Sequence, residues 1–296
     1  MSISTTTTHS VSQRPSPNGS SRSRSTRWPR KYDLMGVGIS ATTYDEAVEA
    51  IFQAVGSREP AVVSLQAAHA VTTASGDPDL RAKVNTFEMI GPDGQPVRWA
   101  LNLLHGLGLR DRLYGPELTL RLCRRAAQQR VPVYFFGSTP EVLSRLQANL
   151  TAMFPGLAVA GVESPPFRVL CEAERDAAVE RINASGAGIV FIGLGAPKQD
   201  HFAHDHRDRI RAVQVCVGAA FDFHAGTLEM APAWMQRRGL EWLYRLMKEP
   251  RRLWRRYLST NSVFLLRLML ALAGRLARRR PRPSVDVSGQ QEGSVP

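Results

Sequence analysis

The chain has 296 residues, of which 43% are hydrophobic, so it is long enough to bury a core in one large domain or two small ones. Its 38 Lys and Arg against 26 Asp and Glu give a net charge of +12, which indicates an anionic partner. Three scattered cysteines without metal-ligand spacing argue against a disulfide framework and favour a reduced, cytoplasmic setting.

Both ends of the chain are predicted to be disordered tails, at residues 1–30 and 281–296. The first tail consists mainly of Ser, Thr, Arg and Pro, and its few apolar residues cannot bury enough surface to offset the loss of chain entropy. Its Arg-rich, acid-free composition also resembles a transit peptide, but it lacks the apolar face of one.

Between the tails, short apolar strands alternate with helical segments. Strands are predicted at 34–40, 61–65, 87–90, 131–136, 157–162, 189–194 and 212–217, and helices at 43–55, 68–84, 118–129, 139–154, 172–184 and 200–210. Proline and glycine mark a turn near residue 77 inside the second helical segment. This alternation is typical of parallel β-α-β units. The predicted fold class is therefore α/β, with a Rossmann-like, mostly parallel sheet over about 31–235.

A basic helical appendage is predicted at 236–280, where thirteen Lys and Arg face only two Glu. On a helical wheel of residues 239–257, apolar side chains that include Trp242 and Trp254 fall opposite the arginines. Pro250 interrupts the pattern, so two short helices in rough phase are expected as readily as one helix. Such a face suits a membrane surface, although amphipathic helices also pack on their own core. No apolar stretch reaches the roughly 20 residues that span a bilayer; the nearest, 263–273, carries Arg267.

Three strand ends have a composition that suits a nucleotide diphosphate. In open α/β sheets, ligands bind at the carboxyl ends of the strands, where helix N-termini present free N–H groups. Each turn alone is ordinary, but three on one edge favour a binding site, and neither Gly-x-Gly-x-x-Gly nor a Walker loop is present. The predicted nucleotide-binding residues are Gly137, Ser138, Gly195, Lys198, Gly218, Phe221 and Asp222.

Asp93 is the carboxylate that stands out. It follows a strand and lies between Pro92 and Gly94, where a general base could reach a substrate hydroxyl. From spacing alone, a simple Pro-Asp-Gly turn is the preferred interpretation. The histidines at 201, 204 and 206 do not have a standard zinc spacing, so no metal site is predicted. No nucleic-acid reading motif is present, and nucleic-acid binding is not expected.

Several segments together resemble the WecG/TagA/CpsF glycosyltransferases, glycosyltransferase family 26, in order and spacing over about 32–262. They are Asp-Gly-Gln-Pro-Val at 93–97, Arg-Leu-Tyr-Gly-Pro-Glu-Leu at 112–118, Gly-Leu-Gly-Ala-Pro-Lys-Gln-Asp at 193–200, Gly-Ala-Ala-Phe-Asp at 218–222, Ala-Pro-Ala-Trp at 231–234 and Gly-Leu-Glu-Trp-Leu-Tyr-Arg-Leu at 239–246. Each segment alone is weak, but the set is specific.

The resemblance implies an inverting transferase that moves a sugar from a UDP-sugar to a polyprenyl-diphosphate-linked saccharide, without a metal ion or cofactor. It would act at the cytoplasmic face of the membrane, in exopolysaccharide, common-antigen or teichoic-acid assembly. Asp93 would be the catalytic base, which reverses the interpretation from spacing. The resemblance assigns substrate contacts to Arg112 and Gln199, and the lipid diphosphate to Arg245, Arg252 and Arg255 in the appendage.

One segment departs from the family pattern. The family usually has Thr-x-Asn at the end of the second strand, and this chain has Ser64-Leu65-Gln66. A hydroxyl and an amide are kept, so Ser64 and Gln66 remain predicted substrate-binding residues. The side chain of Gln66 is one methylene longer than that of Asn, which leaves the identity of the sugar open.

Two other functions are considered. A non-catalytic protein that binds a membrane surface or nucleic acid through its basic C-terminal helices would explain the charge, but it leaves the glycine turns and Asp93 unused. A nucleotide-sugar epimerase or dehydrogenase would require a Gly-x-Gly-x-x-Gly loop, which the chain lacks.

Overall fold

The computed structural model describes residues 26–279, except for the side chains of 252, 253, 255–258 and 276–279 in the last helix. Of the two predicted tails, only residues 26–30 fall within this range. Thr26 donates a hydrogen bond from Oγ1 to the Glu59 carboxylate at 2.7 Å, and Trp28 packs against the core. The rest of both predicted tails lies outside the described residues.

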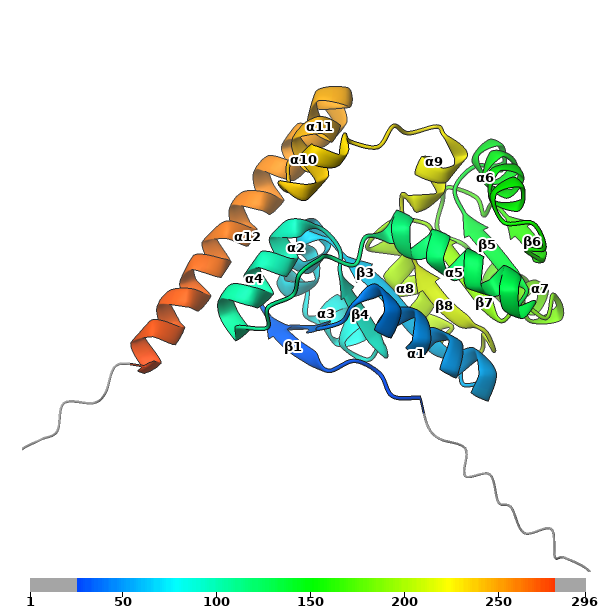
Figure 1. The fold of residues 1–296 in the computed structure, drawn as a ribbon, viewed down its shortest axis with the longest axis horizontal. Coiled ribbons are helices and arrows are strands. Elements are labelled where there is room, and N and C mark those ends of the chain that lie inside the picture. The colour runs from blue at the N-terminus through cyan, green and yellow to red at the C-terminus, as the bar shows by residue number, and fades with distance from the viewer. Residues whose placement is uncertain (1–25, 280–296) are drawn as a thin grey trace, which may run out of the picture.

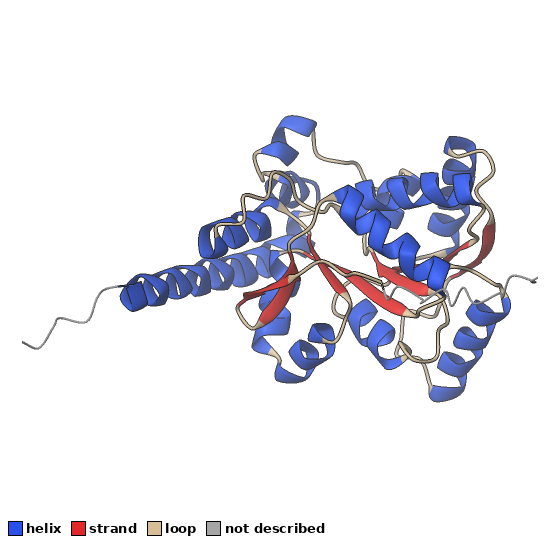
Figure 2. Cartoon of the chain, turned by 60° about the horizontal axis from the view of Figure 1, so that its bottom comes forward, coloured by secondary structure: helices blue, strands red, loops and turns tan. Residues whose placement is uncertain are grey.

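A six-stranded parallel sheet forms the centre of the molecule, which confirms the predicted fold class (Figures 1 and 2). Its strand order is β4-β3-β8-β7-β5-β6. Most side chains of the strands are buried, as expected for a sheet covered on both faces. The strands are β3 (Ala61–Gln66), β4 (Met89–Pro92), β5 (Val133–Gly137), β6 (Val159–Glu163), β7 (Ile189–Gly193) and β8 (Val213–Cys216).

Helices cover both faces of the sheet, and each face has its own hydrophobic cluster. Alternate strand residues enter opposite clusters: Phe135 belongs to one and Phe136 to the other. The first cluster is completed by α1 (Tyr44–Ser57), α5 (Gly115–Gln129), α6 (Pro140–Met153) and α9 (Ala220–Ala225). The second is completed by α2 (Ala68–Gly76), α3 (Pro78–Asn85), α4 (Gln95–His105), α7 (Glu172–Ala184) and α8 (Lys198–Asp205).

Three predicted details are wrong. The strand expected at 34–40 is a hairpin of β1 (Lys31–Leu34) and β2 (Val37–Ser40), which pair antiparallel. Its turn places Met35 and Gly36 at positive φ, and Met gives no sequence signal for such a turn. The helices α4 and α9 were also not predicted. The first begins directly after the predicted Pro-Asp-Gly turn, and the second has only six residues.

The C-terminal segment forms α10 (Ala233–Arg237), α11 (Glu241–Lys248) and α12 (Pro250–Arg279). Of the two arrangements that the sequence left open, the structure has two helices that meet at Pro250, and the second, α12, is 30 residues long. It packs across α2 and α4, where Phe264 and Leu268 are buried in the second hydrophobic cluster. Part of the apolar face thus packs on the core. Within the described residues, no helix combines the length and apolarity needed to cross a membrane.

Candidate active site

A cavity of about 810 Å³ opens beside the carboxyl ends of β3 and β4. Residues of α4, α11 and α12 form much of its wall, and residues of α2, α5 and α9 and of the loops after β3, β4 and β8 and before α5 also line it. Asp93 follows β4 directly, and its backbone N–H bonds the carbonyl of Gln66, the last residue of β3, at 3.1 Å. This strand-end position places the Asp93 side chain in the cavity lining, as the sequence predicted for a residue at the sheet edge.

The Asp93 carboxyl lies in a poorly solvated position that changes its acidity. Burial raises the pKa of Asp93 from the ordinary 3.8 to about 6, and the negative charge of Glu241 acts in the same direction. The guanidinium groups of Arg112 and Arg245 and a hydrogen bond from the Gly115 backbone N–H oppose this rise in pKa. The result is a carboxyl poised near neutral pH, which suits a general base.

Arg112 links the sheet edge to the C-terminal helices. Its Nη1 donates to the Glu241 carboxylate at 2.5 Å, its Nη2 donates to Gln236 Oε1 at 3.3 Å, and its guanidinium lies 3.9 Å from the centre of the Tyr114 ring. The Tyr114 hydroxyl donates to the other Glu241 oxygen at 2.6 Å. The Arg112 side chain is only 7% exposed and that of Glu241 12%, so this ion pair is shielded from water and salt.

Two further polar side chains line the cavity. In each of them, one buried atom lacks a hydrogen-bond partner among the described residues. Arg245 on α11 lies 5.9 Å from the Phe223 ring centre, and its buried Nε has no partner. Gln95, the first residue of α4, is 6% exposed, and its Oε1 also has no partner. Buried polar atoms are normally satisfied, so these two atoms mark a site suited to a polar ligand.

The predicted nucleotide turns lie on adjacent strands, because β8, β7 and β5 are neighbours in the sheet. Gly137 pairs with Gly193 so closely that a Cβ on Gly137 would lie 2.7 Å from the carbonyl carbon of Gly193. Ser138 and Gly195 both have positive φ, and Lys198 is exposed. Gly218 lies between two cavity-lining residues, Val217 and Ala219, so these turns continue the same sheet edge.

Phe221 corrects one part of the nucleotide prediction. Its side chain is fully buried, packs 5.6 Å from the centre of the Phe135 ring, and fills the space above Gly193. The ring therefore belongs to the core and does not face a ligand. The aromatic side chain that this segment presents to the cavity is Phe223. Asp222 lies between them on α9 and is not part of the cavity lining.

Ser64 and Gln66 form a buried cluster with Asp200. The Ser64 hydroxyl donates to the Asp200 carboxylate at 2.6 Å, and Gln66 Nε2 donates to the same oxygen at 3.0 Å. Gln199 is 2% exposed, and its Oε1 accepts the Gly195 N–H at 3.2 Å. None of the three predicted substrate-binding side chains lines the cavity. In this arrangement they tie the start of α8 to the sheet, and direct substrate contact stays a prediction.

The wheel prediction for the basic side chains has a mixed outcome. It placed Arg245 opposite Trp242 and Leu246, but all three line the cavity, because residues three and four apart share one face of a helix. Lys248 is instead paired with Glu229 at 2.7 Å. The side chains of Arg252 and Arg255 lie outside the described part of the chain, so their predicted contact with a lipid diphosphate stays a prediction.

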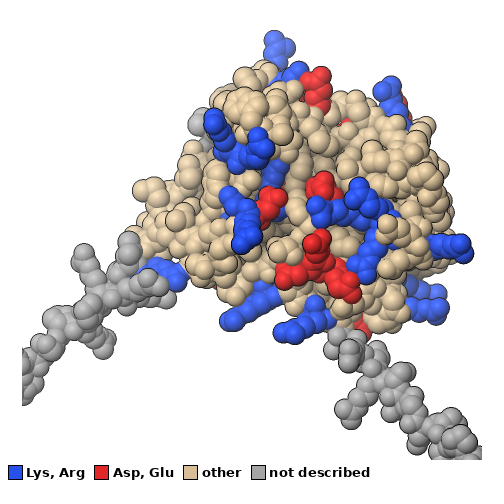
Figure 3. All heavy atoms as spheres, in the orientation of Figure 1, with Lys and Arg blue, Asp and Glu red and all other residues tan. Residues whose placement is uncertain are grey.

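The exposed surface over α1 and α5 is a mixture of charges. Figure 3 shows Lys and Arg beside Asp and Glu on this face, and two of these contacts are Arg125–Glu49 at 2.8 Å and Arg121–Asp45 at 3.3 Å. Several of the charges on this face are therefore paired with one another.

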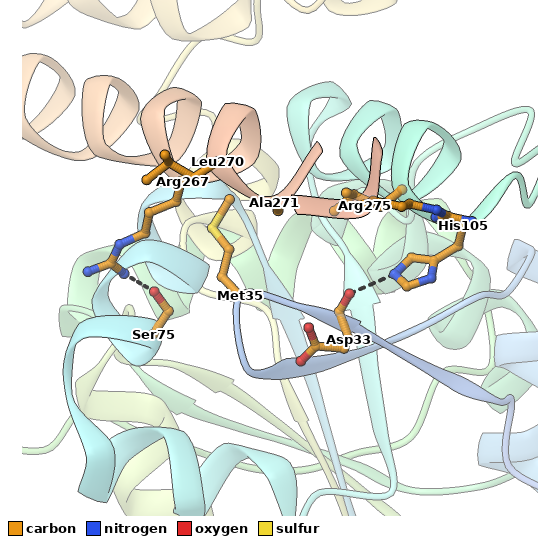
Figure 4. Close-up of a pocket in the computed structure, with 9 residues that line it drawn as sticks. Asp33, Met35, Ser75, His105, Arg267, Leu270, Ala271 and Arg275 are labelled. Carbon is orange, nitrogen blue, oxygen red and sulfur yellow. Dashed lines mark hydrogen bonds between the residues drawn. The ribbon is translucent and has the colours of Figure 1, made fainter. Parts of the chain in front are cut away.

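A second cavity of about 510 Å³ lies where α12 meets α2, α4 and the β1–β2 hairpin (Figure 4). Arg267 of α12 points to α2 and donates to the Ser75 hydroxyl, and a His105 nitrogen lies 2.7 Å from the Asp33 carbonyl oxygen. Here the appendage is fixed to the domain by polar contacts as well as by the apolar contacts of Phe264.

The histidine-rich segment has partners other than a metal. His204 Nδ1 lies 3.1 Å from Asp205, Lys83 pairs with the same carboxylate at 3.5 Å, and His206 Nδ1 lies 2.7 Å from the Phe202 carbonyl oxygen. Within residues 26–279 as described, no three His, Cys, Asp or Glu side chains gather in a way that could hold a metal.

Sequence reasoning missed Tyr114, Glu241, Gln95 and Phe223 as members of the site. Tyr114, Gln95 and Glu241 stand within the segments that carry the family resemblance, so their position was visible but their role was not. Glu241 also had a compositional signal, because it is one of two acidic residues in a strongly basic segment. Only the folded arrangement shows that it reaches Arg112, which precedes it by 129 residues.

The chain is similar in sequence to known proteins. A model of the "Glycosyl transferase WecG/TagA/CpsF family" matches residues 32–279. Among curated proteins, a Bacillus spizizenii enzyme named N-acetylglucosaminyldiphosphoundecaprenol N-acetyl-beta-D-mannosaminyltransferase is 34% identical over 184 residues. The aligned part covers 62% of this chain and 69% of the relative.

Proposed function

The chain belongs to the WecG/TagA/CpsF family of glycosyl transferases, and on this premise we propose that it moves a sugar from a UDP-sugar to a polyprenyl-diphosphate-linked saccharide. The proposed reaction is inverting, requires no metal ion, and serves the synthesis of a cell-envelope or extracellular polysaccharide. The name of the B. spizizenii relative supports this class of acceptor, because it describes a saccharide that is joined to a polyprenol through a diphosphate.

The observation that carries the proposal is the position of Asp93 in the cavity, with two arginines in the same lining. A carboxyl whose pKa is raised to about 6 can accept a proton near neutral pH, as deprotonation of an acceptor hydroxyl requires. Arg112 and Arg245 complement the charge of a diphosphate. The cavity therefore combines a general base with an anion site.

The proposed step is a single displacement. The Asp93 carboxylate takes the proton of the acceptor hydroxyl while the hydroxyl oxygen attacks the anomeric carbon, and the bond from that carbon to the UDP oxygen breaks. Attack from the face opposite to UDP inverts the anomeric configuration. Backbone N–H groups near Gly195 and the side chain of Lys198 would stabilise the charge that develops on UDP. The proton ends on Asp93, the new bond uses an electron pair of the hydroxyl oxygen, and UDP leaves with the electron pair of the broken bond.

The C-terminal helices have two proposed roles. Glu241, Trp242 and Arg245 of α11 complete the cavity, so α11 serves as a lid over the acceptor. The outer face of α12 exposes Leu266 and Met269, at 58% and 67%, as an interfacial helix does. We therefore place the protein on the inner face of the cell membrane, as a peripheral protein of the cytoplasm.

The test is sugar transfer from a panel of radiolabelled UDP-sugars to N-acetylglucosaminyl-diphosphoundecaprenol in detergent with EDTA. The expected result is transfer from one donor that persists in EDTA and is lost in Asp93→Asn. The matched control is Asp208→Asn, because the Asp208 side chain is 93% exposed and lies outside the cavity. Normal turnover in Asp93→Asn would refute the assignment of the base.

The same preparation separates the alternative function, a membrane-binding protein without activity. Saturable binding of UDP is expected for the transferase and has no role in a protein that uses only its basic helices. Vesicle binding without any affinity for UDP would favour the alternative.

A further inference from the structure

Five large apolar side chains both line the cavity and are exposed to solvent. Their exposed fractions run from 39% to 62%. Contiguous exposed patches of apolar side chains usually mark an interaction site. They come from α4 and from the neighbouring helices α11 and α12, which are distant from α4 in sequence, so a single amphipathic helix does not account for them. We call them the apolar rim: Trp99 and Leu103 of α4, Trp242 of α11, and Trp254 and Leu265 of α12.

The polar part of the same cavity lies at the sheet edge. It contains the Asp93 carboxyl, the paired guanidinium of Arg112, and Arg245, whose Nε lacks a hydrogen-bond partner among the described residues. One cavity thus combines a base, cationic groups and exposed apolar side chains. A ligand that complements all three parts has a hydroxyl group, a diphosphate and a hydrocarbon chain in one molecule.

We propose that the apolar rim binds the first isoprenoid units of the polyprenyl diphosphate acceptor. This inference rests on the proposed function and adds a lipid subsite to it. A nucleotide sugar has no hydrocarbon segment, so it gives no reason for an apolar rim. The arginines fix the orientation, because the diphosphate between sugar and lipid must lie near them when the sugar reaches Asp93.

The surface beyond the rim supports the same occupant. Leu266, Met269 and Leu270 follow Leu265 along α12 and are 58%, 67% and 63% exposed. Arg267 lies within this stretch, and its side chain reaches Ser75 on α2 (Figure 4). A hydrocarbon chain that leaves the cavity at Leu265 therefore meets a further apolar surface and not water. This continuity leads the lipid from the cavity to the bilayer.

The first experiment measures equilibrium binding of two soluble probes, geranyl diphosphate and methyl diphosphate, by tryptophan fluorescence without detergent. The wild-type protein is expected to bind geranyl diphosphate at least tenfold more tightly than methyl diphosphate. Leu265→Asp should remove this preference without changing the affinity for methyl diphosphate. Met153→Asp is the matched control, because Met153 at the end of α6 has a similar exposed fraction of 53% but does not line the cavity.

Leu103→Asp is the second variant, since Leu103 belongs to the part of the rim on α4, whereas Leu265 lies on α12. Its side chain is 62% exposed. It should lose the geranyl preference as Leu265→Asp does, with an unchanged melting temperature for both. A geranyl preference that survives in both variants, or that falls equally in Met153→Asp, would overturn the inference. Equal weakening of both probes in the two rim variants would also overturn it, because the damage would then concern the diphosphate.

Transfer kinetics separate this inference from the proposed function. With a geranyl-linked sugar diphosphate as acceptor, Leu265→Asp should raise KM at least tenfold and leave kcat within twofold. If the rim variants lose the geranyl preference but no UDP-sugar supports transfer by the wild type, the rim stands and the proposed function fails. If the wild type uses methyl-linked and geranyl-linked acceptors with equal KM, the proposed function stands and the rim has no role.

Discussion

Arg112 and Glu241 join the sheet edge to the C-terminal helices through an ion pair of 2.5 Å that is almost closed to solvent. The same Glu241 carboxylate accepts a hydrogen bond from Tyr114, whose ring packs against Arg112. A shielded pair with these additional contacts is costly to break, because removal of one partner leaves a buried charge. The closed position of α11 over Asp93 is thus set by a small number of side chains.

The first prediction concerns the pH dependence of transfer. Asp93 must be deprotonated to act as a base, so kcat should rise with pH through about 6. Glu241 raises the pKa of Asp93, while Arg112 and Arg245 lower it. His69 is a further titratable side chain in the lining of the same cavity. Glu241→Gln removes one negative charge, so the acidic limb should move to lower pH.

The measurement is a pH profile of kcat under saturating substrates for the wild type and Glu241→Gln. Glu249→Gln is the control, because Glu249 follows α11 in the chain but does not line the cavity. A limb that stays in place, or moves to higher pH, would contradict the electrostatic coupling of Glu241 to Asp93.

A second prediction is that Asp93→Asn stabilises the protein while it removes activity. The folded state holds the Asp93 proton more tightly than the unfolded chain, since its pKa is about 6 against an ordinary 3.8. Stability is therefore lost as pH rises from about 4 to 6, by roughly 3 kcal/mol at most. Asn carries no charge and avoids this loss.

Chemical unfolding at pH 4 and pH 8 tests this directly. The variant should exceed the wild type by about 1 to 3 kcal/mol in free energy of unfolding at pH 8, with a smaller difference at pH 4. Transfer should fall by roughly 10² to 10⁴. Lower stability of Asp93→Asn at pH 8 would mean that the buried carboxylate is fully compensated by Arg112 and Arg245.

The sheet and most helices could be predicted because their pattern is local. Buried strands such as Val133–Gly137 are uninterrupted apolar runs, and the cap at Thr43 with Glu46 is visible in the sequence and present in α1. The hairpin at Met35 escaped prediction, because its turn depends on a backbone conformation that Met rarely adopts.

The site was predictable only in part, for a different physical reason. Asp93 and Arg112 were identified through segments that resemble a family, and the structure places both in one cavity. The partners of Ser64 could not be predicted, because Asp200 follows it by 136 residues and meets it only after the sheet forms. The burial of the Phe221 ring could not be predicted either, because the ring fills space beside Gly193 that exists only in the folded protein.

A third prediction uses Gly239, which lies between α10 and α11. Its φ is +70°, and a Cβ there would lie 2.6 Å from the Trp99 ring and 3.1 Å from Gln95 Cβ. The turn can therefore rest on α4 only without a side chain. Gly239→Ala should displace α11 from the cavity, raise KM for the lipid acceptor severalfold and lower the free energy of unfolding by about 2 kcal/mol or more.

Gly226→Ala is the matched control, because Gly226 has a similar φ of +72° but open space around the added Cβ. It carries the cost of the left-handed conformation alone, about 1 kcal/mol. The difference between the two variants in thermal unfolding isolates the contact with Trp99. Equal effects in both would show that the turn does not need to lie this close to α4.

The last prediction concerns Arg245 and the acceptor diphosphate. Its Nε has no hydrogen-bond partner within the described part of the chain, while its position on α11 makes it part of the cavity lining. Arg245→Ala should raise KM for the diphosphate-linked acceptor by about tenfold or more, which corresponds to the loss of a charge-assisted hydrogen bond. Arg245→Lys should recover only part of it, since Lys cannot form two parallel hydrogen bonds.

Arg238→Ala is the control for charge, because Arg238 is exposed beside Trp234 and lies outside the cavity. The role of α11 as a lid is tested with point variants. A truncation after Trp234 would also remove Phe264 and Leu268, which are buried in the core, and would therefore disturb the domain itself. KM and kcat for donor and acceptor are measured separately. A rise in the donor KM with an unchanged acceptor KM would assign Arg245 to the nucleotide and reverse the proposed orientation of the two substrates.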